Sequence, residues 1–217
     1  MLVLGGGGDL GAACKAVAAE VIESSKAKEA VILPTAAAFE HLDRVGEQAG
    51  AFFEALGPKP RVLRVLRREG AEDAAIVEAV RSAKLVVLTD GSPLHLRSVL
   101  KGSALFEAIV EARSRGAAVW ASGAGATVLC DPMVDPRGGA YTVGLGLVGG
   151  LAVFPHHDTA PAHLWERSVE LRPEGAVLAG VDEATALVRG VRGGWSVGGS
   201  GAVTLLGEPT GAEPEAY

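Results

Sequence analysis

Short apolar runs alternate with helix-forming stretches through the first 130 residues, and this alternation constrains the fold more than any other feature. The apolar runs fall at residues 2–4, 30–33, 61–66, 85–88 and 117–121. Strands of this length separated by helices predict βαβ units, which build a parallel sheet with helices on both faces. Because such crossovers are right-handed, the expected result is a doubly wound sandwich.

The stretches between these runs are expected to be helical. They share apolar residues at helical spacing and cover residues 9–23, an Ala- and Phe-rich segment ending near residue 57, and residues 71–82, 94–100 and 104–115. The run at 85–88 is apolar throughout, which is typical of a central strand buried on both faces.

The chain changes character from Tyr141 onward. Short strands now alternate with Gly-rich turns, at residues 143–148, 151–154, 176–179, 185–188, 195–197 and 202–206, with one helical stretch at 163–171. This pattern predicts antiparallel strands added to the parallel core. We therefore expect an α/β three-layer sandwich with a mostly parallel central sheet and antiparallel strands in the C-terminal third. We also expect residues 1–206 to form one domain and residues 207–217, rich in Gly, Pro and Glu, to form a flexible tail.

Composition excludes several function classes. A net charge of −6 over 217 residues and a pI near 5.4 argue against nucleic-acid binding, which needs a basic face. No apolar run is long enough to span a bilayer, and the N-terminus lacks the basic region of a signal peptide, so a cytoplasmic protein without a membrane partner is expected. Asn is absent and Gln48 is the only Gln, which fits a thermophile or a GC-rich genome. Cys14 and Cys130 are expected to be buried free thiols.

The segment AVWASGAGATVLC, residues 118–130, predicts a nucleophile elbow. An apolar strand runs into small residues and then into a helix, and such a strained turn lifts one side chain above the sheet. Backbone N–H groups at the start of the helix can stabilise an oxyanion.

At this point the chain resembles the cyanophycinase and dipeptidase E family of serine peptidases. That family carries a Gly-x-Ser-Ala-Gly-Ala elbow, and residues 121–126 read Ala-Ser-Gly-Ala-Gly-Ala, so Gly123 stands at the nucleophile position. Other family-like motifs follow in the family's order: Gly5-Gly6-Gly7 with Asp9, Leu33-Pro34-Thr35-Ala36, Leu88-Thr89-Asp90-Gly91-Ser92, Gly144-Leu145-Gly146-Leu147, His156, and Val181-Asp182-Glu183-Ala184-Thr185-Ala186. The resemblance covers about residues 1–190 and implies a class I glutamine amidotransferase-like fold.

The resemblance also implies roles for site residues. His156 would be the general base and Glu183 the residue that orients it, while the loop with Asp90, Gly91 and Ser92, together with Ala124, would form the oxyanion hole and the cleft beside it. Three departures coincide with the chemistry. Gly123 replaces the serine, Asp90 replaces a glycine and adds charge that opposes an oxyanion, and Ser92 replaces an Asp or Asn. We predict a catalytically impaired or non-peptidase homologue of these serine peptidases.

Two alternatives stay open. One is an active hydrolase of small acidic peptides or amides that uses Ser122, or a water activated by His156 and Glu183. Because successive strand side chains point to opposite faces, the Ser122 hydroxyl is expected to point away from His156 and to bond a backbone group. The other is a protein that reuses the cleft to bind a small peptide, an acidic small molecule or another subunit. Related folds often self-associate, which makes a homodimer a further expectation.

Neither a metal nor a cofactor is predicted. His156, His157, Asp158 and His163 invite a metal interpretation, but adjacent histidines on a strand point in opposite directions and no HExxH spacing is present. The glycine run at 5–8 lacks the Gly-Lys-Ser/Thr of a phosphate-binding loop. Gly6, Gly8 and Gly11 have dinucleotide-loop spacing, but the second strand ends at Pro34-Thr35, without the acidic residue that a ribose requires.

Overall fold

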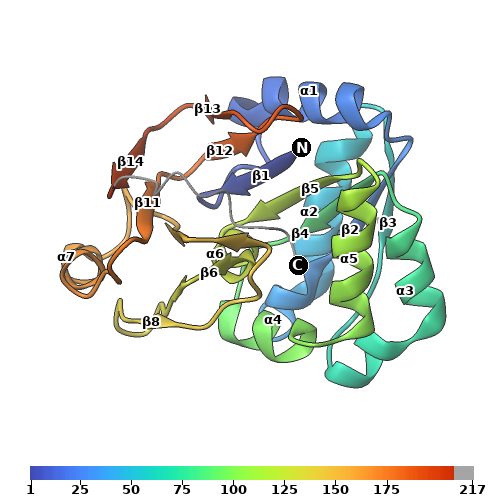
Figure 1. The fold of residues 1–217 in the computed structure, drawn as a ribbon. Helices are drawn as coiled ribbons and strands as arrows, with labels where there is room; N and C mark the ends of the chain where they lie inside the picture. The colour runs from blue at the N-terminus through green and yellow to red at the C-terminus, as the bar shows by residue number, and fades with distance from the viewer. Residues whose placement is uncertain (208–217) are drawn as a thin grey trace.

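The computed structural model describes residues 1–207 and shows a main sheet of seven strands (Figure 1). The spatial order is β13 (Trp195–Gly199), β12 (Thr185–Arg189), β1 (Leu2–Gly5), β5 (Ala118–Ser122), β4 (Leu85–Leu88), β2 (Glu29–Leu33) and β3 (Lys59–Val62). The five strands from β1 to β3 in this order are mutually parallel, while β12 and β13 extend the sheet antiparallel. The predicted α/β sandwich is confirmed. Residues 208–217, most of the predicted tail, lie outside the described residues.

Helices cover both faces of the main sheet, as the alternation predicted. One face packs against α1 (Lys15–Ser25) and α2 (Leu42–Glu54), and the other against α3 (Ala74–Arg81), α4 (Pro93–Leu100), α5 (Ala104–Ser114) and α6 (Ala124–Leu129). Strand β5 shows the alternation at the residue level, because Trp120 packs with Phe52 and Phe53 of α2 while its neighbours Val119 and Ala121 join the opposite core.

The C-terminal third also builds a second sheet, seen at the left of Figure 1. Its order is β14 (Val203–Leu206), β11 (Val177–Val181), β10 (Leu151–Phe154), β6 (Cys130–Asp131) and β9 (Val148–Gly149). Its inner face, with Val153 and Ala179, shares a core with α6, and its outer face packs against α7 (Ala162–Glu170) through Phe154 and Trp165. Beside it β7 (Met133–Val134) pairs with β8 (Tyr141–Thr142).

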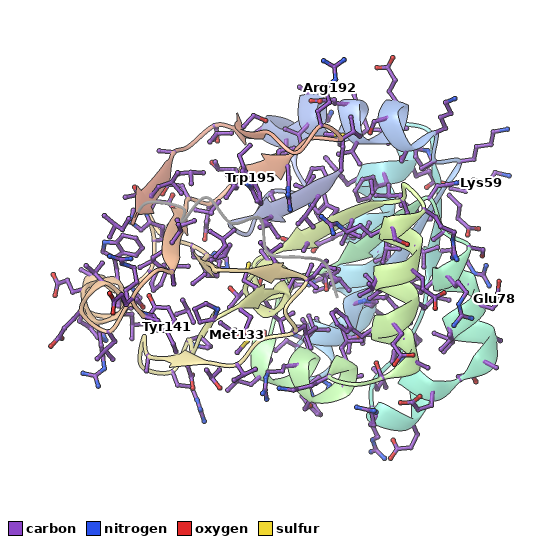
Figure 2. The ribbon with its side chains drawn as sticks, viewed as in Figure 1. Lys59, Glu78, Met133, Tyr141, Arg192 and Trp195 are labelled. Carbon is purple, nitrogen blue, oxygen red and sulfur yellow. The ribbon has the colours of Figure 1, made fainter. Side chains whose placement is uncertain are left out.

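Side chains drawn as sticks show the two halves of the molecule (Figure 2). Lys59 and Glu78 point outward from the helix-covered half, whereas Met133 and Tyr141 lie in the half built around the second sheet. No helix within residues 1–207 is long and apolar enough to cross a bilayer. Cys14 and Cys130 are buried and free, as expected from the sequence.

Two predicted helices begin later than the sequence pattern indicated. The stretch at 9–23 becomes a 3₁₀ turn, η1 (Ala12–Cys14), followed by α1, because Asp9 is buried beneath the glycine turn instead of capping a helix. The stretch at 71–82 divides into η3 (Arg68–Glu72) and α3, because Asp73 accepts hydrogen bonds from two backbone N–H groups and restarts the helix. A further turn, η2 (Pro34–Ala37), precedes α2.

The strand predicted at 143–148 is wrong over most of its length, since only Val148 lies in a strand and residues 143–147 form a loop. The backbone N–H groups of this loop do not pair with a neighbouring strand. Gly144 N–H donates to the Asp131 carboxylate, and Leu145 N–H donates to the Val128 carbonyl. A Cβ on Gly144 would also meet the Cys130 carbonyl, so the glycine allows this loop to pass close to the start of β6. Close packing to a neighbouring segment therefore replaces ladder pairing here.

The architecture brings several loops to one place. The parallel strands β1, β4 and β5 end at the same edge of the main sheet. Strands β10 and β11 are parallel to each other, and the loops after them approach that edge, where His156 N–H donates to the Gly6 carbonyl and Ala184 N–H to the Gly7 carbonyl. The candidate site lies at this junction.

Candidate active site

The predicted elbow is present between β5 and α6. The turn residue Gly123 has φ 47° and ψ −106°, a conformation that residues with a side chain rarely adopt, and α6 begins at the next residue. A Cβ built on Gly123 would lie 2.1 Å from Oδ1 of Asp90. The Asp90 carboxylate therefore fills the space into which a side chain at position 123 would project.

Asp90 is held there by three hydrogen bonds. Its Oδ1 accepts from the backbone N–H groups of Gly91 and Ala124, each at 2.7 Å, and its Oδ2 lies 2.8 Å from Nε2 of His156. Burial opposes ionisation of this carboxyl, but the His156 contact and the two N–H donors outweigh it, so the pKa of Asp90 is lowered. Asp90 is thus an anion fixed in a two-amide pocket.

His156 bridges two carboxylates. Its Nδ1 lies 2.9 Å from Oε1 of Glu183, opposite the Asp90 contact at Nε2. Glu183 is itself positioned, because Thr159 Oγ1 donates to its Oε1 and its backbone N–H donates to Asp158. The imidazole is therefore fixed at both ring nitrogens.

Gly7 makes room for the His156 ring. A Cβ at Gly7 would lie 2.1 Å from Cε1 of His156, so no larger residue fits without moving the imidazole. The glycine turn after β1 thereby serves as the seat of the histidine, a role that its sequence alone did not reveal.

The two carboxylates change the ionisation of the imidazole. Chiefly through the hydrogen bond that His156 donates to Asp90, with Glu183 contributing, the pKa of His156 is raised to about 9 despite burial. The resting site at neutral pH is an imidazolium between two carboxylates.

We expect this pair to make stability depend on pH. A raised histidine pKa stabilises the fold fully below the unfolded value of about 6.5, and the contribution is lost as pH rises through about 9. The thermal midpoint should fall between pH 6.5 and 9.5 in the wild type and fall less in His156→Gln, measured by scanning fluorimetry. His163→Gln, on exposed α7, is the control and should behave as wild type. If the thermal midpoint changed equally with pH in His156→Gln and the wild type, the contacts of His156 with the two carboxylates would not stabilise the fold.

A second carboxylate, Asp9, is buried under the elbow. It accepts hydrogen bonds from Trp120 Nε1 at 2.6 Å, from Ser122 Oγ at 2.5 Å and from the Gly7 backbone N–H at 3.1 Å. Burial raises its pKa, against the effect of the hydrogen bonds from Ser122 and Trp120. Asp9 ties the glycine turn after β1 to strand β5.

Ser122 and Ser92 form their hydrogen bonds outside the cluster of Asp90, His156 and Glu183, although Ser122 lines the same cleft. The Ser122 hydroxyl donates to Asp9 and not, as expected, to a backbone group. Ser92 caps α4, accepting from the His95 N–H through its hydroxyl, while its own N–H donates to the Ala36 carbonyl. Of the residues singled out from the sequence, the structure brings together Asp90, Gly91, Gly123, Ala124, His156 and Glu183.

An open cleft of about 1220 Å³ leads to the site. Asp90 and His156 lie on its wall, and the side chains of both are about a third exposed. Lys15, Glu40, His41 and Arg44, all exposed, line the same cleft from α1, the residues before α2 and the first turn of α2. Two cationic side chains, Lys15 and Arg44, and one carboxylate therefore flank the approach to the Asp90–His156 pair.

The residues of the metal interpretation are dispersed. His157 Nδ1 contacts Asp182 and its ring packs edge-on against Trp165, while Asp158 accepts from the Glu183 N–H. His163 is exposed on α7. Within residues 1–207, no three His, Cys, Asp or Glu side chains are grouped to hold a metal ion.

An elbow, a His–carboxylate pair and two converging amides on an α/β sandwich together resemble the active site of a serine hydrolase. The profile of Peptidase family S51 matches residues 1–192, and the chain belongs to that family. It is similar to the crystal structure of a peptidase from an acI-B1 Actinobacterium, with 29% identity and a TM-score of 0.82 over 93% of this chain and 88% of that one. It also resembles in fold a candidate peptidase E protein from Listeria monocytogenes EGD-e, with 16% identity and a TM-score of 0.65 over 94% and 96%. Comparison with curated protein sequences gives no significant match.

Sequence reasoning missed two features of this site. It placed Asp90 beside the oxyanion hole but did not foresee that its carboxylate enters the hole, and it assigned no site role to Lys15 or Arg44. The sequence held a signal for the position of the Asp90 carboxylate. Asp90 and Gly123 both depart from the family pattern, and the added carboxylate compensates for the missing side chain. No local pattern marks Lys15 or Arg44, because they reach the cleft only through packing of α1 and α2.

Proposed function

We propose that this S51 member does not act as a serine peptidase and that its cleft binds a small acidic ligand. One observation carries the first part: the Asp90 carboxylate occupies both the space above Gly123 and the two N–H donors of Gly91 and Ala124. A peptide carbonyl needs those donors for its tetrahedral intermediate, and the attacking hydroxyl needs that space. Both are taken by an anion.

The hydrogen bond of the Ser122 hydroxyl also argues against serine-peptidase chemistry. Ser122 donates to Asp9, and the space above the elbow on the His156 side is filled by Asp90. A nucleophile must sit within hydrogen-bond reach of its base, and Ser122 is bonded to a different acceptor. Water activation by His156 and Glu183 alone is also disfavoured, because Nε2 is bonded to Asp90 and the raised pKa keeps the ring protonated at neutral pH.

The acidic ligand follows from the charges of the cleft. Lys15 and Arg44 line the cleft and outnumber its exposed acid Glu40, and Arg matches a carboxylate with two parallel N–H donors. A small dicarboxylate or an acidic dipeptide would place its acid group against Arg44 or Lys15. Its other end would reach the His156–Asp90 pair.

One experiment tests both parts with the same compound. An aspartyl dipeptide such as Asp-Leu is incubated with the protein, cleavage is followed by chromatography, and binding is measured by titration calorimetry. We expect binding without cleavage, and Arg44→Gln should weaken binding about tenfold or more, the effect of one charge-assisted hydrogen bond. Asp43→Gln, an exposed acid next to Arg44 but outside the cleft lining, is the matched control. Turnover at an ordinary enzyme rate would refute the first part, and equal affinity in Arg44→Gln the second.

A further inference from the structure

The two-amide pocket is filled by an oxygen of the protein itself. Gly91 and Ala124 N–H groups lie 2.7 Å from Asp90 Oδ1, within the range expected for donors that stabilise an oxyanion. The pocket can therefore stabilise a negative charge that develops on Oδ1 of Asp90. Such a charge develops when an ester of Asp90 is hydrolysed, because water then adds to Cγ.

We propose that Asp90 is the nucleophile of a hydrolase acting on a small alkylating substrate, an epoxide, with His156 as acid and base and Glu183 as its positioning residue. This activity goes beyond the proposed function, which denies serine chemistry and assigns an acidic ligand. Carboxylates are established enzyme nucleophiles that form covalent esters. Asp90 lines the 1220 Å³ cleft and its side chain is about a third exposed, which gives a substrate access.

In the first step Oδ2 of Asp90 attacks a ring carbon of the epoxide. The Oδ2–carbon bond forms, the carbon–oxygen bond of the ring breaks, and the ring oxygen leaves with the bonding electrons. Because the attack comes from the side opposite the breaking bond, that oxygen leaves on the far side of the carbon from Oδ2. The Nε2 proton of the His156 imidazolium, which is bonded to Oδ2 at rest, therefore passes to it through one water molecule of the cleft. The products are a hydroxyalkyl ester of Asp90 and a neutral imidazole, and the total charge is unchanged.

In the second step the neutral imidazole takes a proton from a water molecule. The hydroxide adds to Cγ of Asp90, and Oδ1 becomes the oxyanion held by Gly91 and Ala124 N–H. Collapse breaks the Cγ–Oδ2 bond, and the alkoxide that leaves takes the carboxyl proton. The sum is epoxide plus water giving a diol, with the Asp90 carboxylate and the His156 imidazolium restored.

The ionisation of the site fits both steps. The pKa of His156 is raised chiefly by Asp90, so the imidazolium that donates a proton in the first step is the resting form. Esterification removes the negative charge of Asp90 and with it the main cause of the raised pKa, so the imidazole is free to act as a base in the second step.

An amide is a poor substrate for the same geometry. Attack by Asp90 on a carbonyl would put the oxyanion on the substrate carbon, while the two donors are already bonded to Oδ1. An epoxide does not need the two donors in the first step, since its negative charge develops on the ring oxygen, which leaves on the side of the carbon away from Oδ2. The arrangement thus separates this chemistry from peptide hydrolysis.

The test uses oxirane-2-carboxylate, whose acid can pair with Lys15 or Arg44, and neutral 1,2-epoxypropane, which needs neither residue. The wild type is incubated with each in ¹⁸O water for many turnovers, digested, and the peptide containing Asp90 is weighed by mass spectrometry. We expect oxygen-18 in the Asp90 carboxylate and diol in solution with at least one epoxide. His156→Gln should slow both steps, but the strained ring can still open with a proton from water, whereas ester hydrolysis loses its base and slows about 10²-fold or more, so the ester should accumulate on Asp90.

Asp90→Asn should abolish both the adduct and diol formation, while Asp43→Asn, outside the cleft, should retain both. Diol formed with oxygen-18 only in the diol and none in Asp90 would overturn the proposal in favour of direct attack by water. Absence of any adduct in His156→Gln, together with no diol from either epoxide in the wild type, would also overturn it. Binding of Asp-Leu without cleavage would stand in either case, so the two proposals fail independently.

Discussion

The double variant Asp90→Gly/Gly123→Ser should react with a fluorophosphonate probe, whereas wild type and Gly123→Ser should not. In the double variant the carboxylate leaves the space above the elbow, and the new hydroxyl can approach Nε2 of His156, which Glu183 already orients. The two N–H donors of Gly91 and Ala124 become free for the phosphonyl oxygen. Because a base near a hydroxyl contributes about 10²- to 10⁴-fold, labelling should rise at least 10²-fold over wild type.

The single change Gly123→Ser is the informative comparison. Its Cβ would lie 2.1 Å from Oδ1 of Asp90, whose carboxylate is held in place by three hydrogen bonds, so the serine can enter only by displacing that carboxylate. We expect Gly123→Ser to lower the unfolding free energy by about 1–3 kcal/mol, the usual cost of a strained backbone position, and to label poorly. Intact mass with peptide mapping measures labelling, and Ser122→Ala in the double-variant background shows whether the label is on residue 123. Equal labelling of Gly123→Ser and the double variant would contradict the role assigned to Asp90.

Asp9→Ala should be among the most destabilising single changes in this protein. It leaves the buried donors of Trp120, Ser122 and Gly7 without an acceptor, and each unsatisfied buried group costs about 1–3 kcal/mol. Relief of the buried charge offsets part of this, so the expected loss is about 3 kcal/mol or more in the free energy of unfolding. Urea titration followed by tryptophan fluorescence measures it.

Asp73→Ala is the matched control for this change. Asp73 accepts hydrogen bonds from two backbone N–H groups, but it is an exposed helix cap. Replacing such a cap by Ala typically lowers the free energy of unfolding by about 1 kcal/mol. An Asp9→Ala loss no larger than that of Asp73→Ala would show that the buried cluster contributes little. A larger loss in the free energy of unfolding would show that the hydrogen bonds of Asp9 hold the glycine turn against β5.

The sequence determined the architecture because its signals are local. Alternating apolar runs and helical stretches suffice for a parallel sheet covered on both faces, and the small residues around Gly123 suffice for an elbow. Errors arose where tertiary contacts overrode local pattern. The apolar residues 143–147 follow a strand-like pattern, yet packing against the Cys130 carbonyl makes them a loop. Asp9 resembles a helix cap, yet burial against Trp120 removes it from the helix.

The sequence also determined which residues stand at the chemistry, since Gly123, Asp90, His156 and Glu183 were all singled out from their motifs. Only the tertiary structure decided what they do together. Asp90 and Gly123 are 33 positions apart, and one side chain can fill the space left by the other only because β4 and β5 are neighbours and end at the same edge. Where a carboxylate points depends on donors that folding brings from Gly91, Ala124 and His156, and no spacing along the chain records that convergence.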